Sequence, residues 1–453
     1  MAGIRVGCGG CAVCGRVTME DYIRMLTEQI RCVRAREDVA REIRTHIQDQ
    51  ASFYEKQGME REEALRKAVR DMGDPVSVGV EMDRIHRPRM DWKLLVMAAL
   101  LGIGGLLVQY AAGALGEGTE MLLRQTMYTG IGFAIMVGIC FLDYSMIGKY
   151  AAWLYVLYVC GILLARFGMQ ETNGMYRGMM MPMYLFIPIY AGMLYRNRGR
   201  GVAGLIKGML FLLPPLLIAL YAIPSIVTAL CLFMICTGML LTAVVKGWFG
   251  TARKKMAGLL LSAGAVLPAA FGAFAYAFFL ADYQKMRIAA FLTPWKYSGE
   301  AGYIYVVLRQ LFGKWRWFGG ITGGAADMVT KDYVLARLIT IYGMAVGMVI
   351  VCALTAFLVH VLLVALRQKN QLGLMIGMGS VLLFLVQTVI GLAVNFSILP
   401  STTVMLPFLT YGGTATAVYS VFIGLLLSVY RNQNVLGDRQ YKPGWRLVLR
   451  LER

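Results

Sequence analysis

Between about residues 94 and 430, the sequence is a succession of apolar runs separated by short linkers that carry nearly all of the local charge. Most runs are close to the roughly 20 residues that an α-helix needs to cross a bilayer. They lie at residues 94–112, 126–143, 149–167, 180–195, 203–222, 224–246, 256–281, 333–365, 372–396 and 403–430. These runs predict an all-α fold: a polytopic membrane protein of about ten transmembrane helices, preceded by a small cytoplasmic helical domain.

The composition and charge agree with a membrane environment. The chain has 58% hydrophobic and 16% charged residues, whereas soluble proteins have roughly 45–50% and 25%. A net charge of +19 would suggest nucleic acid in a soluble protein, but here the basic residues gather in alternate linkers, as in cytoplasmic loops. These residues are Arg196, Arg198, Arg200, Lys207, Arg253, Lys254, Lys255, Arg367 and Lys369. We expect a bacterial inner-membrane protein with both termini in the cytoplasm and no nucleic-acid partner.

Charge and periodicity divide the chain into four parts. We expect residues 1–18 to be a disordered extension, residues 19–90 a cytoplasmic helical prefix domain, residues 91–432 the membrane domain and residues 433–453 a basic cytoplasmic tail. Cys8, Cys11 and Cys14 in the extension have the spacing of a zinc or iron–sulfur motif. Because the next thiol is distant and lies on a predicted helix, we favour an extension without metal.

The prefix domain has apolar residues at helical spacing, beginning with Tyr22, Leu26 and Ile30. The stretch from Gly58 to Pro75 resembles the small helical domain found ahead of various bacterial membrane proteins. That resemblance implies a docking or signalling module. A solvated helical cap with no specific partner is the alternative.

Two segments outside the apolar runs have an unusual composition. The linker of about residues 282–331 combines aromatic and basic residues and ends in a Gly-rich turn, which suits an ordered loop at the outer membrane–water interface. The stretch from Leu399 to Thr414 combines Pro, Gly and hydroxyl residues at the start of a predicted span. Because freed backbone groups at membrane depth need partners, we expect it to line a cavity. A Pro-kinked helix with close packing is the alternative.

The stretch from 399 to 414, with Gln387 and Asn395 before it, resembles the signature of the SEDS family (shape, elongation, division and sporulation), which includes FtsW, RodA and SpoVE. A second match lies at residues 287–295, which include Pro294 and Trp295. Further matches at residues 143–144 and 173–177 extend the resemblance over about residues 94–432.

The resemblance implies polymerisation of lipid II at the outer face of the membrane, with a class B penicillin-binding protein as partner. An older proposal for the family is lipid II transport. The family's key carboxylate matches Asp332, which is followed by Tyr333, and we assign it the role of catalytic base. A divalent cation, Mg²⁺ or Mn²⁺, at the substrate diphosphate is left open. The ordinary alternative for Asp332 is a helix N-cap.

We expect the other site residues to bind the substrate. The cations are Arg177, Lys331 and Arg337, although interfacial anchoring would also explain them. The remaining candidates are Gln387, Asn395, Pro294, Trp295, Thr410, Tyr411, Gly412, Gly413 and Thr414.

Several polar positions depart from the family pattern. Thr340 and Ile341 stand where the family has paired glutamates, Gly178 replaces a Trp, and the segment at 222–229 lacks the family's acid. Because intramembrane acids are usually functional, their loss favours a second reading: a scaffold that binds a lipid-linked precursor or a penicillin-binding protein without catalysis. A transporter is the third reading, disfavoured by the almost wholly apolar second to seventh spans.

Overall fold

The computed structural model describes residues 18–88, 90–113, 118–169, 176–250, 253–278, 282–299, 301–320, 333–402 and 404–433. These residues form two compact units, an N-terminal unit within residues 18–88 and a membrane unit within residues 90–430. The cysteine-rich extension and nearly all of the basic tail lie outside the described residues, so the predictions made for them stay predictions.

The N-terminal unit contains four helices, α1 (Met19–Glu28), α2 (Val33–Lys56), α3 (Arg61–Asp71) and α4 (Pro75–His86). Leu26, Ile30 and Ile47 are fully buried in its core. Helix α4 begins at Pro75, because proline is compatible with the first position of a helix and Asp74 accepts a hydrogen bond from the Ser77 N–H at 2.9 Å.

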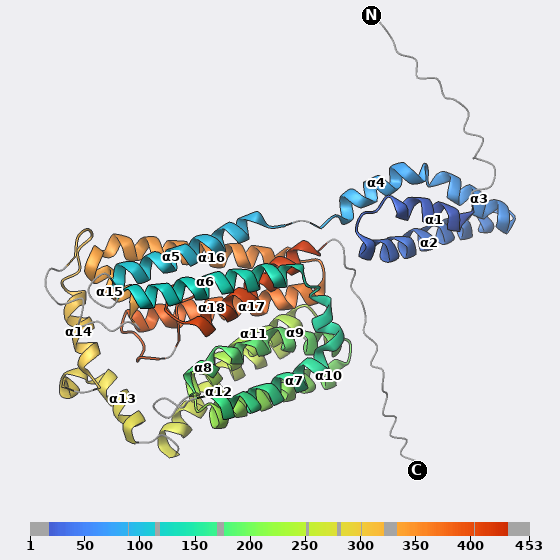
Figure 1. Ribbon diagram of the computed structural model, residues 1–453. Helices are drawn as coiled ribbons and strands as arrows, with labels where there is room; N and C mark the ends of the chain where they lie inside the picture. The colour runs from blue at the N-terminus through green and yellow to red at the C-terminus, as the bar shows by residue number, and fades with distance from the viewer. Residues whose placement is uncertain are drawn as a thin grey trace, which may run out of the picture. The chain divides into compact units, whose positions relative to one another are not determined.

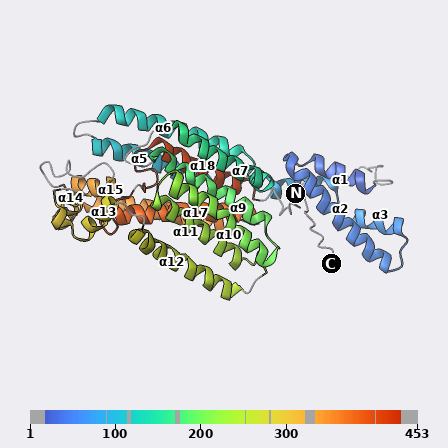
Figure 2. The ribbon, with the colours of Figure 1, turned by 90° about the horizontal axis from the view of Figure 1, so that it is seen from below.

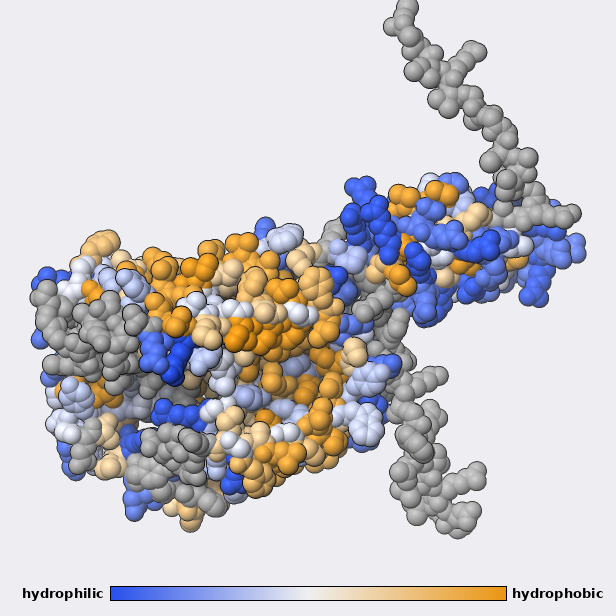
Figure 3. Space-filling view, in the orientation of Figure 1, coloured by the Kyte–Doolittle hydropathy of each residue, from blue (hydrophilic) through white to orange (hydrophobic). Residues whose placement is uncertain are grey.

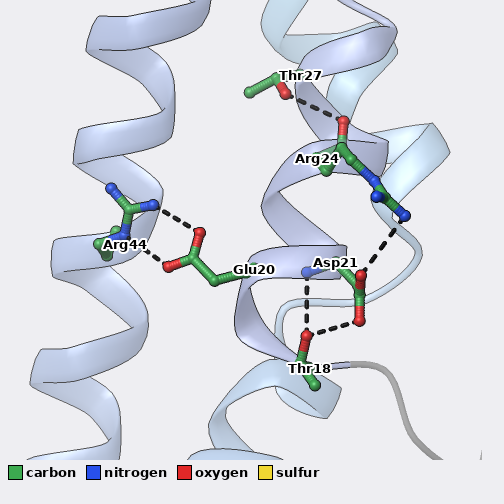
Figure 4. Close-up of polar contacts among 6 residues, drawn as sticks. All are labelled: Thr18, Glu20, Asp21, Arg24, Thr27 and Arg44. Atoms are coloured by element: carbon green, nitrogen blue, oxygen red, sulfur yellow. Dashed lines mark hydrogen bonds and ion pairs between the residues drawn. The ribbon is translucent and has the colours of Figure 1, made fainter.

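Polar contacts fix the start of α1 in this unit (Figure 4). The Thr18 hydroxyl accepts the N–H of Asp21 at 3.2 Å and donates to the Asp21 carboxylate at 2.6 Å. The Arg44 guanidinium on α2 donates to both carboxylate oxygens of Glu20, at 2.7 and 3.2 Å. The cap and the bidentate ion pair therefore set the first turn of α1 against α2.

Within the described residues, every regular element of the membrane unit is a helix. Its elements are α5 (Trp92–Gly113), α6 (Gly118–Phe141), α7 (Ser145–Gly168), α8 (Arg177–Met180), η1 (Pro182–Leu185), α9 (Phe186–Arg196), α10 (Gly201–Leu217), η2 (Ile218–Ala222), α11 (Ile226–Val245), α12 (Arg253–Phe278), α13 (Asp282–Leu292), η3 (Pro294–Tyr297), α14 (Tyr303–Phe312), α15 (Val334–Tyr342), α16 (Met344–Leu366), α17 (Gln371–Asn395) and α18 (Gly413–Arg431). Ten segments of the described chain are long and apolar enough to cross a membrane. The prediction of an all-α protein with about ten spans is confirmed.

Helix α17 lies near the centre of this unit and packs against α16, α11 and α9, while α7 packs on α9 and α12 on α11 (Figures 1 and 2). Helices α17 and α18 are mostly buried, whereas α7 and α12 expose most of their apolar surface. On the face shown in Figure 3, hydrophobic residues cover much of the side of the membrane unit, as lipid contact requires. The N-terminal unit is mainly hydrophilic in the same view.

Two of the predicted spans have different limits in the structure. The run at 333–365 is interrupted at Gly343, which has φ 97° and separates α15 from α16. The run at 403–430 becomes helical only at Gly413, because the preceding residues, which include Pro407, form a non-helical segment. Both differences lie at the end of the membrane unit that carries α13, α14 and α15, which we call the α14 end (Figure 1).

Candidate functional site

The first turn of α15 is capped by a side chain from another helix. Its N-cap residue, Tyr333, makes no side-chain capping bond. Instead the Oδ1 atom of Asn395, the last residue of α17, accepts the N–H groups of Leu335 at 3.0 Å and Ala336 at 3.2 Å. The Asn395 Nδ2 group donates to the Gly391 carbonyl at 2.8 Å. The buried carboxamide thus has partners on both of its polar atoms and joins α15 to α17.

The C-terminal end of α15 is held by the long loop. Beyond Gly343, the N–H groups of Met344 and Ala345 have left α15 and have not yet entered the α16 hydrogen-bonding pattern. They donate to the carbonyls of Arg316 at 2.8 Å and Trp317 at 3.1 Å. A Cβ atom on Gly343 would lie only 2.8 Å from the Trp317 carbonyl oxygen. The loop therefore completes the helix break, and glycine is required by both φ and space.

The described residues of 396–412 are non-helical and pack inside the α14 end; we call them the re-entrant segment. A Cβ on Gly105, in α5, would overlap the Phe408 carbonyl oxygen, so α5 approaches this segment closely. The Gln109 amide of α5 donates to the Leu409 carbonyl at 2.7 Å. The Tyr419 hydroxyl of α18 donates to the Met405 carbonyl at 3.1 Å.

Gln125 of α6 supports the same segment from another side. Its Oε1 atom accepts the Gly412 N–H at 3.2 Å, and its Nε2 group donates to the Thr416 hydroxyl at 3.3 Å. Such side-chain partners allow irregular backbone at membrane depth. We did not predict Gln109 or Gln125 as site residues. The available signal was a polar amide inside the apolar run at 94–112 and another directly before the run at 126–143.

Helix α14, which is part of the long loop, contacts the re-entrant segment. The Tyr305 hydroxyl accepts the Ser401 N–H at 2.8 Å and lies 3.1 Å from the Ser401 hydroxyl. Leu308, Ala336 and Val394 belong to one buried apolar cluster, so α14, α15 and α17 meet beside these polar contacts. The α14 end is therefore a packed junction of loop, short helix and re-entrant segment.

The predicted site residues fall into three groups. Asp332 and Lys331 lie outside the described residues and stay predictions. Asn395, Thr410 and Gly412 belong to the hydrogen-bonded group at the α14 end: the Thr410 hydroxyl accepts the Leu406 N–H at 3.0 Å. The third group has no shared location. Arg337 on α15, Gln387 on α17 and Pro294 on η3 are buried, whereas Arg177 on α8, Trp295 on η3 and Thr414 on α18 are exposed. Gly413 lies against the Tyr128 ring, and the centroid of the Tyr411 ring lies 6.3 Å from that of Tyr128.

Within the described part of the chain, no group of three or more His, Cys, Asp or Glu side chains could hold a metal ion. The expectation of a divalent cation at the substrate diphosphate stays a prediction.

The fold and these contacts define a polytopic helical membrane protein whose irregular backbone is gathered at one end of the bundle. Residues 89–435 match the FtsW/RodA/SpoVE family model of cell cycle proteins. The chain belongs to this family, which confirms the resemblance inferred from the sequence.

Named relatives and solved structures show the same similarity. A probable peptidoglycan glycosyltransferase FtsW of Alkalilimnicola ehrlichii is 27% identical over 377 residues, 75% of this chain and 89% of that protein. A probable peptidoglycan glycosyltransferase FtsW of Thioalkalivibrio is 30% identical over 175 residues, 36% of this chain and 43% of that protein.

The rod shape determining protein RodA of Thermus thermophilus has a TM-score of 0.53 at 20% identity, covering 76% of this chain and 97% of that one. A chain from a structure described as a peptidoglycan synthase complex that coordinates polymerization and crosslinking has a TM-score of 0.60 at 19% identity, covering 76% of this chain and 98% of that one. These two similarities concern the fold.

Proposed function

We propose that this protein is a divergent SEDS glycosyltransferase that polymerises lipid II at the outer face of a bacterial inner membrane. Its α14 end faces outward, and both termini lie in the cytoplasm, because the basic linkers gather at the opposite ends of the spans. A class B penicillin-binding protein is its partner, in division, shape or spore formation. Relatives bearing the name peptidoglycan glycosyltransferase over most of the membrane domain support this assignment.

The observation that carries the proposal is how α15 begins. An aspartate ahead of an apolar helix is ordinarily explained as an N-cap that accepts the N–H groups of the first turn. Here Asn395 takes the N–H groups of Leu335 and Ala336. These are N–H groups of the first turn that a capping side chain accepts, and their pairing with Asn395 supports our proposal that Asp332 serves as a catalytic carboxylate.

In the proposed reaction, Asp332 accepts the proton of an acceptor sugar hydroxyl. The hydroxyl oxygen forms a bond to the anomeric carbon of the donor, the bond from that carbon to the diphosphate oxygen breaks, and undecaprenyl pyrophosphate leaves with the bonding electrons. With a reference pKa near 3.9, an aspartate is ionised at neutral pH. Arg337, Lys331 and Arg177 supply positive charge for the diphosphate, and a divalent cation would bind through Asp332 and phosphate oxygens.

One observation favours the scaffold as the second candidate. Thr340 stands where the family has a glutamate, and its buried hydroxyl donates to the Ala336 carbonyl of its own helix at 2.8 Å. This position therefore supplies no acid to the α14 end. The scaffold would bind a lipid-linked precursor or the penicillin-binding protein without forming glycan.

The test is glycan formation by the purified chain together with its penicillin-binding partner and lipid II. We expect strands from the native chain and none from Asp332→Ala. Asp282→Ala is the matched control. Asp282 is an exposed aspartate at the start of α13, at the other end of the long loop. Absence of strands from the native chain, in conditions where a typical SEDS pair makes them, would replace the enzyme with the scaffold.

A further inference from the structure

We propose that the end of the membrane unit opposite the α14 end carries a binding site for an anionic phospholipid, built from the loops that follow α9 and α11 (Figure 1). Its basic residues are Arg198 and Arg200 after α9, Lys246 after α11, and Arg253 at the start of α12; we call them the basic cluster. This site lies apart from the residues assigned to glycosyl transfer, and it does not depend on whether the chain makes glycan.

The part of the chain that forms the cluster has no acidic residue to balance its charge. Residues 172–281 contain nine Lys and Arg residues and no Asp or Glu. The Arg198 guanidinium donates to the Gln371 Oε1 atom at 2.9 Å, and the Arg200 guanidinium donates to the Asn197 Oδ1 atom at 3.0 Å. Gln371 and Asn197 carry no charge, so they orient the guanidinium groups and add no negative charge to the cluster. An anion is the ligand that complements such a surface.

Backbone and aromatic contacts lock the two loops together. The Gly199 N–H donates to the Trp248 carbonyl at 2.7 Å. The Trp248 ring lies edge-on to the Tyr195 ring, with centroids 6.1 Å apart, and both side chains are buried. The neighbouring Phe249 is also buried, and a Cβ on Gly204 of α10 would lie 3.1 Å from its ring. The surface that the loops present is therefore preorganised, which lowers the entropy cost of binding a ligand.

The contact between the loops brings Arg200 and Arg253 to one turn. Arg200 directly follows Gly199, so its backbone lies beside Trp248. The Arg253 guanidinium covers Gly247, where an added Cβ would lie 2.5 Å from the Arg253 Nη2 atom. Gly247 has φ 76°, and the missing side chain leaves its backbone open to the guanidinium. Two guanidinium groups thus reach the same turn from different loops, an arrangement that suits the several oxygens of a phosphate group.

Apolar side chains beside the cluster favour a lipid headgroup as the source of the phosphate. Val202 and Ile206 on α10, Val245 directly before Lys246, and Leu259 on α12 are each more than half exposed. In a bilayer such side chains contact acyl chains, while neighbouring basic residues reach the phosphate layer. A soluble phosphate compound would use only the basic cluster, whereas a phospholipid uses both surfaces.

The same end of the membrane unit offers a matched control. Lys93, near the start of α5, and Arg367, after α16, are exposed basic residues, as are Arg200 and Arg253. They belong to helices that pack on each other and not to the loops that form the cluster. Replacing Lys93 and Arg367 by glutamine therefore removes two charges from this end and leaves the basic cluster intact.

The experiment measures the binding of dioctanoyl phosphatidylglycerol, dioctanoyl phosphatidylcholine and inorganic phosphate to the full chain in neutral detergent, by native mass spectrometry. We expect the native chain to bind phosphatidylglycerol at least tenfold more tightly than the other two. One charge-assisted hydrogen bond changes affinity by about tenfold. Arg200→Gln with Arg253→Gln should therefore weaken phosphatidylglycerol binding at least tenfold, and Lys93→Gln with Arg367→Gln less than threefold. Arg200→Lys with Arg253→Lys keeps the charge and should bind more tightly than the glutamine pair.

Four results would overturn the proposal. Equal affinity of the native chain for the two lipids excludes a site for an anionic headgroup, and equally tight binding of inorganic phosphate assigns the cluster to a soluble anion. Equal losses in the cluster pair and the control pair show that diffuse surface charge is responsible. Equal losses in the glutamine and lysine pairs trace the effect to altered structure and not to charge. Because no readout involves glycan synthesis, these results leave the proposed function in place, and its failure leaves the lipid site in place.

Discussion

At the scale of single residues, the α14 end depends on side-chain amides that reach far along the chain. Gln109 and Gln125 bond to Leu409 and Gly412, which lie 300 and 287 positions later in the chain. The sequence indicated that the stretch around Gly412 is irregular, because its Pro, Gly and hydroxyl content is unusual for a span. It could not show which side chains satisfy that backbone, because such pairings follow from the packing of distant helices.

Replacing Gln125 by leucine should destabilise the membrane unit. The change leaves the Gly412 N–H and the Thr416 hydroxyl without this buried partner, and an unpaired buried polar group costs about 1–3 kcal/mol. We expect a lower thermal unfolding midpoint in detergent than for Gln310→Leu, which alters an exposed glutamine on α14. Equal midpoints for the two variants would contradict the role given to Gln125.

His86 gives the N-terminal unit a pH dependence. Burial lowers the pKa of His86 below its usual value, against the opposing charges of Glu42, Asp38 and Asp83. The folded state disfavours the protonated ring. The contribution of His86 to the free energy of unfolding is therefore fully present above the unfolded-state pKa of about 6.5 and is lost as the pH falls below it.

The measurement is an NMR titration of His86 in the full chain, assigned with His86→Gln. We expect a midpoint below that of an unstructured histidine peptide. The N-terminal unit of His86→Gln should also lose less stability than that of the native chain between pH 6.5 and 5. A midpoint above that of the peptide would show that the carboxylates outweigh burial.

At the scale of elements, the break between α15 and α16 is the main departure from what the sequence predicted. An apolar run from 333 to 365 reads as one span, and a glycine inside such a run is compatible with a continuous helix. The break at Gly343 requires the carbonyls of Arg316 and Trp317 as partners for the freed N–H groups. These partners lie in the long loop, and the periodicity of the apolar run does not predict the path of that loop.

Gly343→Ala tests the break directly. Alanine is strained at φ 97°, and its Cβ would crowd the Trp317 carbonyl, so we expect destabilisation of about 1–3 kcal/mol and reduced glycan synthesis. Gly313→Ala, in the long loop, is the control, because the φ of Gly313 is −71° and no atom lies within 4 Å of the added Cβ. Chemical denaturation in detergent and the polymerisation assay measure the two effects; matching results for both variants would refute the requirement for glycine.

At the scale of the whole molecule, the fold class was the most predictable property. A helix that crosses a bilayer must be long and apolar, and the count of about ten spans follows from this requirement alone. The candidate site was predictable only in part. The motif around Thr410–Thr414 located the re-entrant segment, whereas the support of α15 by Asn395 depends on how α14, α15 and α17 meet.

In the proposed function, the α14 end performs glycosyl transfer with Asp332 as base. The most direct measurement is the initial rate of glycan strand formation from lipid II by the native complex and by Asp332→Asn, with crosslinking blocked. The asparagine keeps the size of the side chain but cannot accept the proton, so we predict a rate lower by about a hundredfold or more with lipid II binding retained. Strand formation by Asp332→Asn at the native rate would show that Asp332 is not the catalytic base.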